Sequence, residues 1–121
     1  MSKTILTVDD SASIRQMVSL TLSGAGYTVI EAVDGSDGYT KATSNKVDAV
    51  ITDLNMPVMN GIEFIRKFRT HPSSTGVPII FLSTESDDGM KQQAKEAGAL
   101  GWIVKPFKQD QLLAVIKKVA G

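Results

Sequence analysis

Short apolar segments alternate with amphipathic segments along the whole chain. Five of the short segments are rich in Val, Ile and Leu and are bounded by turn residues, which is typical of β-strands. Between them, apolar side chains recur at steps of three and four residues, which predicts helices. The predicted strands are 4–8, 28–32, 49–52, 77–82 and 101–104, and the clearest helical spacings fall within 14–25, 62–68 and 112–119.

Two further helices have weaker signals. The segment between the second and third strands has an apolar face of Tyr39 and Ala42, but Gly38 within it is a poor helix former. The fourth helix, at 87–97, offers only one methionine and two alanines for burial. We therefore expect the fourth helix to pack loosely on the sheet.

The alternation of strands and helices predicts the fold class. Five strand–helix repeats indicate parallel strands joined by right-handed crossovers, with helices on both faces of the sheet. The third and fourth strands are apolar without alternation, as strands buried on both faces are, and Thr28 and Glu31 suit the second strand to an edge. We predict an α/β protein, a three-layer sandwich around a parallel five-stranded sheet, with residues 1–121 forming a single domain.

Composition narrows the chemistry that such a sheet can support. The chain has 121 residues, with 13 basic and 13 acidic side chains, a formal net charge of +0 and no cysteine. The absence of cysteine excludes disulfide scaffolds, cysteine-ligated metal centres and thiol catalysis. Because the net charge is zero, the composition shows no excess of basic residues of the kind that binds nucleic acid or an anionic membrane. No apolar stretch has the length of a membrane span or of the apolar part of a signal peptide. We therefore expect a cytoplasmic protein without nucleic-acid or membrane partners.

Polar side chains follow four of the five predicted strands, at the point where each strand ends. They are Asp9 and Asp10 after the first strand, Asp53 after the third, Ser83 and Thr84 after the fourth, and Lys105 after the fifth. Because the carboxyl ends of parallel strands lie along one edge, we expect these side chains to line the crevice where open α/β sheets bind ligands.

These residue types point to phosphoryl transfer. If the second strand lies outside the first, the first and third strands are neighbours about 4.8 Å apart. The carboxylates of Asp9, Asp10 and Asp53 would then crowd one crevice, which is unfavourable for like charges unless a cation lies between them. Oxygen ligands without histidine or thiol favour Mg²⁺. Lys105 and Ser83 can then face an anion, and Asp53 is the candidate nucleophile, because a carboxylate that attacks phosphorus forms an acyl phosphate.

Each of these residues also has an ordinary structural interpretation. Asp9 and Asp10 precede Ser11 and could cap the first helix. Asp53 could open a turn, Ser83 and Thr84 could cap the fourth helix, and Lys105 could be a solvated lysine before a proline. What these interpretations leave unexplained is that every suitable polar residue falls at the carboxyl end of a strand.

Together these residues resemble the receiver domain of bacterial response regulators, and most closely its stand-alone, CheY-like chemotaxis form. The resemblance extends from Thr4 to Val119 and implies the flavodoxin-like strand order 2-1-3-4-5 and a receiver without an output domain. It is carried by Asp9-Asp10, by the Asp53-Leu54-Asn55-Met56-Pro57 loop running on to Gly61, by Ser83, and by Lys105-Pro106-Phe107.

The resemblance implies a metal site. Asp10 and Asp53 would ligate Mg²⁺ directly, Asn55 would offer its backbone carbonyl, and Asp9 would act mainly through a bound water. Asp53 would also be the phosphoacceptor.

The resemblance also implies roles around the phosphoryl group. Ser83 resembles the switch hydroxyl and Lys105 the cation that contacts phosphoryl oxygens, and the Lys105–Pro106 bond resembles one that the family usually holds cis. Trp102 stands where the family places a switch aromatic, although a tryptophan that simply belongs to the core or the edge strand is the competing interpretation.

Positions two residues beyond the acceptor and the switch hydroxyl tune phosphoryl lifetime in such proteins. Here they are Asn55 and Glu85, a pair that resembles fast-turnover chemotaxis regulators. Two ordinary loop residues are the alternative. Thr84, beside Ser83, departs from the family pattern and is grouped with these tuning positions.

The implied function is that of a phosphorylation-operated switch. A sensor histidine kinase would phosphorylate Asp53, and the face built from the fourth helix, the fifth strand and the fifth helix would change its affinity for a downstream protein, with a flagellar motor component as the first candidate. The protein would be a monomer and would catalyse only its own phosphorylation and dephosphorylation. It would not otherwise be an enzyme.

Three alternatives remain open. A phosphate sink would drain a kinase without any output target. An aspartate-nucleophile phosphatase is disfavoured because Asn55 stands where that chemistry wants a second aspartate. A phosphorylation-independent binding module is disfavoured because every chemical position is intact.

Overall fold

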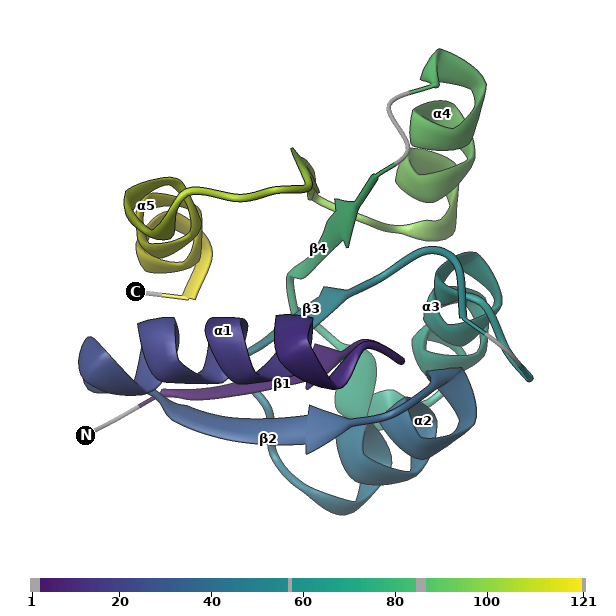
Figure 1. Cartoon of the computed structure of the whole chain (residues 1–121). Helices are drawn as coiled ribbons and strands as arrows, with labels where there is room; N and C mark the ends of the chain where they lie inside the picture. Colours follow the sequence, from purple (N-terminus) through teal and green to yellow (C-terminus); the bar gives the residue numbers. More distant parts are fainter. Residues whose placement is uncertain (1–2, 57, 85–86, 121) are drawn as a thin grey trace.

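Five parallel strands form one sheet in the order β2-β1-β3-β4-β5 in the computed structural model, which describes residues 3–56, 58–84 and 87–120. The α/β three-layer architecture confirms the prediction from the sequence pattern, and the strand order confirms what the resemblance implies (Figure 1). The elements along the chain are β1 (Thr4–Val8), α1 (Ala12–Gly24), β2 (Thr28–Ala32), α2 (Gly35–Ser44), β3 (Ala49–Thr52), α3 (Gly61–Arg69), a short 3-10 helix (Pro72–Ser74), β4 (Ile79–Ser83), α4 (Asp88–Ala97), β5 (Gly101–Val104) and α5 (Gln109–Ala120).

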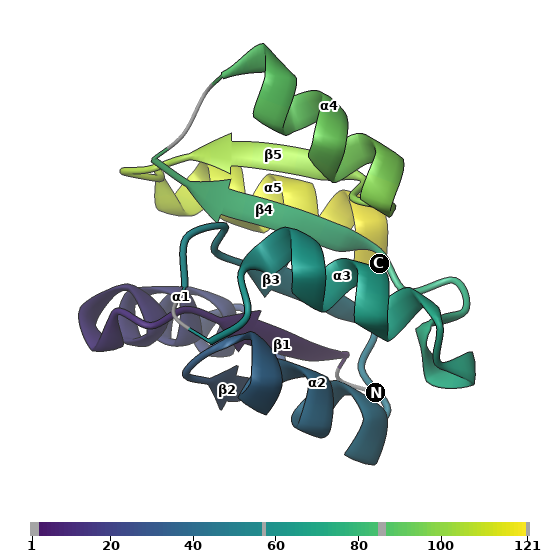
Figure 2. The same ribbon diagram turned by 90° about the vertical axis from the view of Figure 1, so that its right-hand side faces the viewer.

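The helices cover both faces of the sheet. Figure 2 shows α2, α3 and α4 in front of the strands, with α1 and α5 behind them. Two apolar clusters correspond to these two layers. One is centred on Phe64 and Phe68 of α3, and the other on Leu22 of α1 with Leu112 and Ile116 of α5. No helix among the described residues is long and apolar enough to cross a membrane.

The start of β4 differs from the prediction. The sequence pattern predicts a strand over 77–82, whereas β4 runs over Ile79–Ser83. Pro78 has no N–H to give to the ladder, although its carbonyl accepts a hydrogen bond from the Val50 N–H at 2.9 Å. At the other end, the Ser83 carbonyl accepts from the Lys105 N–H at 2.9 Å, which keeps Ser83 in the sheet.

Glycine in α2 allows a close approach to the sheet. A Cβ on Gly38 would lie 3.0 Å from Cγ2 of Val8 in β1. The helix therefore forms in spite of its poor propensity because the missing side chain lets it lie against the strand. Its first turn is held by Asp34, whose side chain accepts a hydrogen bond from the Asp37 N–H at 2.8 Å.

The helices next to the candidate site have their own caps. Ser11 caps α1, Asn60 and Glu63 form a capping box on α3, and Asp87 caps α4. The alternative in which Asp9 and Asp10 cap the first helix is therefore wrong.

Helix α4 has a small apolar contact with the rest of the fold. Ala94 is its one buried residue among those described, and Met90 and Ala97 are partly buried against the same cluster. At its carboxyl end the left-handed Gly98, with φ of 110°, closes the last turn. These contacts are those expected of the loosely packed fourth helix.

A second close approach places α3 directly behind Asp53. Gly61 begins this helix, and its N–H donates to the Leu54 carbonyl at 2.9 Å. A Cβ on Gly61 would collide with the Asp53 carbonyl oxygen and would lie 2.6 Å from Cε1 of Phe81. Only glycine fits between the Asp53 backbone and the Phe81 ring of β4.

We predict different effects for two glycine-to-alanine substitutions. Gly61→Ala should lower the free energy of unfolding by about 1–3 kcal/mol, because the methyl group forces the Asp53 backbone and Phe81 apart. Gly24→Ala is the control, because its Cβ meets nothing within 4 Å, and it should be neutral or raise stability by up to about 1 kcal/mol. Urea unfolding measures both, and equal effects at the two positions would contradict the packing described here.

Candidate functional site

The hydrogen-bond ladder of the sheet continues one residue beyond β1, β3 and β5, and these additional residues are Asp9, Asp53 and Lys105. The Asp53 N–H donates to the Val8 carbonyl at 2.8 Å, and the Asp9 N–H donates to the Ala32 carbonyl at 3.1 Å. Strand β1 pairs with β3 so that Val8 lies opposite Thr52. Asp9 and Asp53 therefore leave neighbouring strands at the same level, at the carboxyl edge of the sheet.

Three carboxylates meet at this edge, as predicted. Asp9, Asp10 and Asp53 each offer an oxygen, and these oxygens lie within 4.8 Å of one another. Asp9 and Asp53 are 2% and 6% exposed, whereas Asp10 is exposed. The cluster is thus closed on the protein side and open to solvent at Asp10.

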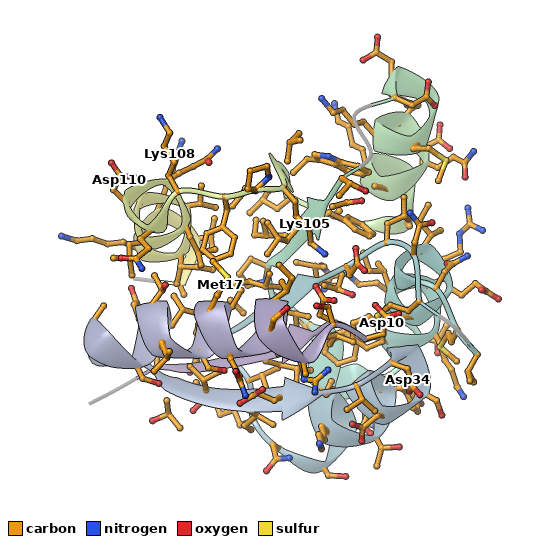
Figure 3. All side chains as sticks on the ribbon, in the orientation of Figure 1. Asp10, Met17, Asp34, Lys105, Lys108 and Asp110 are labelled. Carbon is orange, nitrogen blue, oxygen red and sulfur yellow. The ribbon has the colours of Figure 1, made fainter. Side chains whose placement is uncertain are left out.

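Lys105 reaches into this cluster from the end of β5. Its Nζ lies 3.0 Å from Oδ2 of Asp9 and 3.4 Å from Oδ1 of Asp53, and its side chain is 12% exposed. Figure 3 shows Lys105 extending toward the loop that carries Asp10. The alternative of a solvated lysine is therefore wrong, because burial against two carboxylates is its actual environment. The Lys105–Pro106 peptide is cis, as the resemblance implies.

The carboxyl of Asp53 is electrostatically crowded. Burial, followed by the charge of Asp9, raises its pKa above the ordinary value of 3.8. Lys105 and the Leu54 N–H, which donates to Oδ1 at 2.9 Å, oppose this rise. Ionisation of this carboxyl therefore costs more free energy than ionisation of a free aspartate, and a nearby cation offsets that cost.

The backbone and side chain of Asp9 are held at several points. Its Oδ1 accepts from the Ser11 N–H at 2.9 Å, and its backbone carbonyl accepts from Nη1 of Arg15 at 2.5 Å. Arg15 is a residue that sequence reasoning missed. Its position in the first turn after the Asp9-Asp10 pair was the available signal, but an arginine there reads equally well as a surface residue.

The donor set fits a hard divalent cation. The cluster supplies carboxylate oxygens without nitrogen or sulfur, which are the ligands that Mg²⁺ prefers. Asp10 leaves one side open to solvent, and Mg²⁺ usually keeps several of its waters.

The hydroxyl side of the site lies on β4. Ser83 is fully buried at the carboxyl end of the strand, next to β5 in the sheet, while Thr84 is exposed. Asp87 caps α4, so the alternative in which Ser83 and Thr84 cap that helix is wrong.

Asn55 is exposed in the loop after Asp53. Glu85, named as a tuning position, lies outside the described residues.

Trp102 lies in β5, on the side of the sheet covered by α4. Its ring stacks on Phe81 with centroids 5.2 Å apart, and it packs against the apolar cluster of α3 and its neighbours. It also lines a hollow of about 250 Å³ between α4 and β5. The other residues that line this hollow are Lys91, Ala94, Lys95, Ala99, Leu100 and Gly101.

A family model and several solved structures match nearly the whole chain. The family model for the response regulator receiver domain matches residues 5–117. Among solved structures, the chemotaxis protein CheY4 of Vibrio cholerae is 45% identical, covers 98% of this chain and 99% of its own, and has a TM-score of 0.95. The receiver domain of the sensor histidine kinase PA1611 from Pseudomonas aeruginosa PAO1, with a magnesium ion coordinated in its active site cleft, is 27% identical, covers 100% of this chain and 99% of its own, and has a TM-score of 0.92.

The curated relatives are longer proteins. The phosphate regulon transcriptional regulatory protein PhoB of Pseudomonas aeruginosa is 35% identical over 119 residues, which are 98% of this chain and 52% of PhoB. The response regulator ArlR of Staphylococcus aureus is 38% identical over 115 residues, which are 95% of this chain and 51% of ArlR. The chain thus spans about half the length of the curated relatives that it matches.

Proposed function

Because this chain belongs to the response regulator receiver domain family, we propose that it is a phosphorylation-operated switch whose acceptor is Asp53. The observation that carries this proposal is the placement of Lys105 between Asp9 and Asp53 within the carboxylate cluster. A buried carboxylate, a lysine at hydrogen-bond distance and a buried hydroxyl on the next strand are groups that phosphoryl transfer to an aspartate uses.

The proposed donor is a phosphohistidine of a sensor histidine kinase. An oxygen of the Asp53 carboxylate attacks the phosphorus, the P–N bond to the histidine breaks, and its electron pair returns to the imidazole ring, which takes a proton from solvent. The product is an acyl phosphate. Lys105 then exchanges its contact with Asp53 for one with a phosphoryl oxygen, and Ser83 donates its hydroxyl to another.

The cation that assists this transfer is proposed to be Mg²⁺. When bound, it supplies positive charge against the phosphoryl oxygens and against the crowded carboxylates. Asp10 and Asp53 would hold it directly, together with the backbone carbonyl of Asn55, and Asp9 would act through a bound water. Exposed Asn55 and Thr84, together with Glu85, would govern the access of hydrolytic water and therefore the phosphoryl lifetime.

We predict that a small acyl phosphate adds one phosphoryl group to the chain when Mg²⁺ is present, and none when the metal is chelated. Asp53→Asn should abolish this labelling, because an amide does not form the acyl phosphate. Intact-protein mass spectrometry with peptide mapping measures both the number of groups and their position.

The matched control for labelling is Asp88→Asn in α4. Asp88 is exposed in the first turn of that helix, so its variant should be labelled like the wild-type chain. Modification at another residue, or full labelling of Asp53→Asn, would refute the assignment of the acceptor.

We propose that the output surface is formed by α4, β5 and α5. The hollow between α4 and β5 supports this, because Trp102 lines it together with exposed Lys91 and Lys95 of a helix that has one buried residue. Elements with few buried contacts are those that rearrange at low cost.

Given the similarity to a Vibrio cholerae chemotaxis protein, we propose a protein target in chemotaxis, with a flagellar motor component as the first candidate. No nucleic acid or membrane partner is proposed, and the chain is proposed to be monomeric.

We predict that Mg²⁺ with beryllofluoride, which mimics an acyl phosphate on aspartate, changes amide hydrogen exchange in residues 88–104 and leaves residues 35–44 unchanged. The Asp53→Asn variant should show no change of hydrogen exchange. Ser83→Ala should show a smaller change than the wild-type chain, because the proposed hydrogen bond from the Ser83 hydroxyl couples the modified Asp53 to β4. Hydrogen exchange read by mass spectrometry measures this peptide by peptide.

The same measurement separates a switch from a phosphate sink. A chain that is labelled on Asp53 but shows no change of exchange in residues 88–104 would be a sink without output, and the switching proposal would be rejected.

A further inference from the structure

Arg15 donates a hydrogen bond to the backbone of Asp9, whose carboxylate belongs to the acidic cluster. It lies in the first turn of α1, its side chain is 15% exposed, and its Nη1 donates to the backbone carbonyl of Asp9 at 2.5 Å. Its Nε lies 3.5 Å from Oε1 of Glu31 in β2, whose side chain is 44% exposed. The guanidinium thus ties together the first helix, the second strand and the end of the first strand.

The carbonyl that Arg15 holds belongs to the peptide between Asp9 and Asp10. The orientation of this peptide sets the direction in which the Asp10 side chain leaves the backbone. Asp9 is fixed independently, by its N–H on the Ala32 carbonyl and by its side chain on Ser11 and Lys105. Asp10 is exposed, so the backbone on either side of it is what places its carboxylate near those of Asp9 and Asp53.

The strength of this contact favours a positioning role. A guanidinium bonded to a carbonyl is a charge-assisted donor, and shielding from water strengthens it. The exposed pair with Glu31 is weak by comparison, but it brings a negative charge beside the guanidinium and so reduces its repulsion of a bound cation.

We infer that Arg15 is a positioning residue for the cation site, which acts by fixing the Asp9–Asp10 peptide so that Asp10 can ligate together with Asp53. This inference rests on the proposed Mg²⁺-assisted function and adds to it a residue outside the ligand set. A purely electrostatic role predicts the opposite effect, because removal of a positive charge near a cation site raises the affinity for the cation.

The test is calorimetric titration of the full chain with MgCl₂. Arg15→Gln should weaken binding about tenfold, the low end of what loss of a partner behind a metal ligand costs. Arg15→Lys keeps the charge and one flexible donor, so its affinity should lie between those of Arg15→Gln and the wild-type chain. The control Arg66→Gln makes the same change of charge on the exposed face of α3 and should leave the affinity unchanged within about twofold.

Each outcome decides the inference. Tighter binding by Arg15→Gln would show a charge effect and overturn it, and unchanged binding by both Arg15 variants would reduce Arg15 to a structural residue. Thermal unfolding without Mg²⁺ checks that each variant folds. If Arg15→Gln does not fold, the affinity of Arg15→Lys decides alone. Weaker Mg²⁺ binding by Arg15→Lys supports the inference, and unchanged binding overturns it.

The wild-type titration separates this inference from the proposed function. If the wild-type chain itself fails to bind Mg²⁺, the proposed function loses its metal site and the inference fails with it. If the wild-type chain binds and the Arg15 variants bind equally well, only the inference fails.

Discussion

The parallel ladder holds the buried carboxylates of Asp9 and Asp53 side by side, with the exposed carboxylate of Asp10 beside them, and the repulsion between Asp9 and Asp53 is the constraint on which the site depends. Hydrogen bonds from Asp9 and Asp53 continue the ladder beyond β1 and β3, so either residue can move away only by losing its hydrogen bond to the neighbouring strand. Lys105 relieves part of the repulsion from the end of β5, but the pKa of Asp53 remains raised. A site that is short of positive charge in this way is ready to accept a cation and a phosphoryl group together.

The same sheet connects the site with the proposed output surface. Ser83 ends β4 at the site, and two residues earlier on that strand Phe81 stacks on Trp102 of β5. Phe81 also faces Gly61, which begins α3 directly behind Asp53. A structural change at Asp53 can therefore be transmitted through the packing of Gly61, Phe81 and Trp102 to the hollow between α4 and β5.

Much of this arrangement could be predicted from sequence because it depends on local patterns. Runs of Val, Ile and Leu predict the strands, and polar residues directly after them predict the edge where Asp9, Asp53 and Lys105 meet. What could not be predicted depends on contacts between segments far apart. The salt bridge of Lys105 with Asp9 spans most of the chain, and the hydrogen bond from Arg15 to a backbone carbonyl leaves no trace in residue type.

The measurement that tests this account most directly is the pKa of Asp53, followed by carbon NMR of its carboxyl group in the metal-free full chain. The account predicts a pKa above the ordinary 3.8, which rises further in Lys105→Met and falls in Asp9→Asn, because Lys105 lowers it and Asp9 raises it. A pKa at or below 3.8, or one that neither substitution moves, would contradict the crowding of charge from which the proposed function follows.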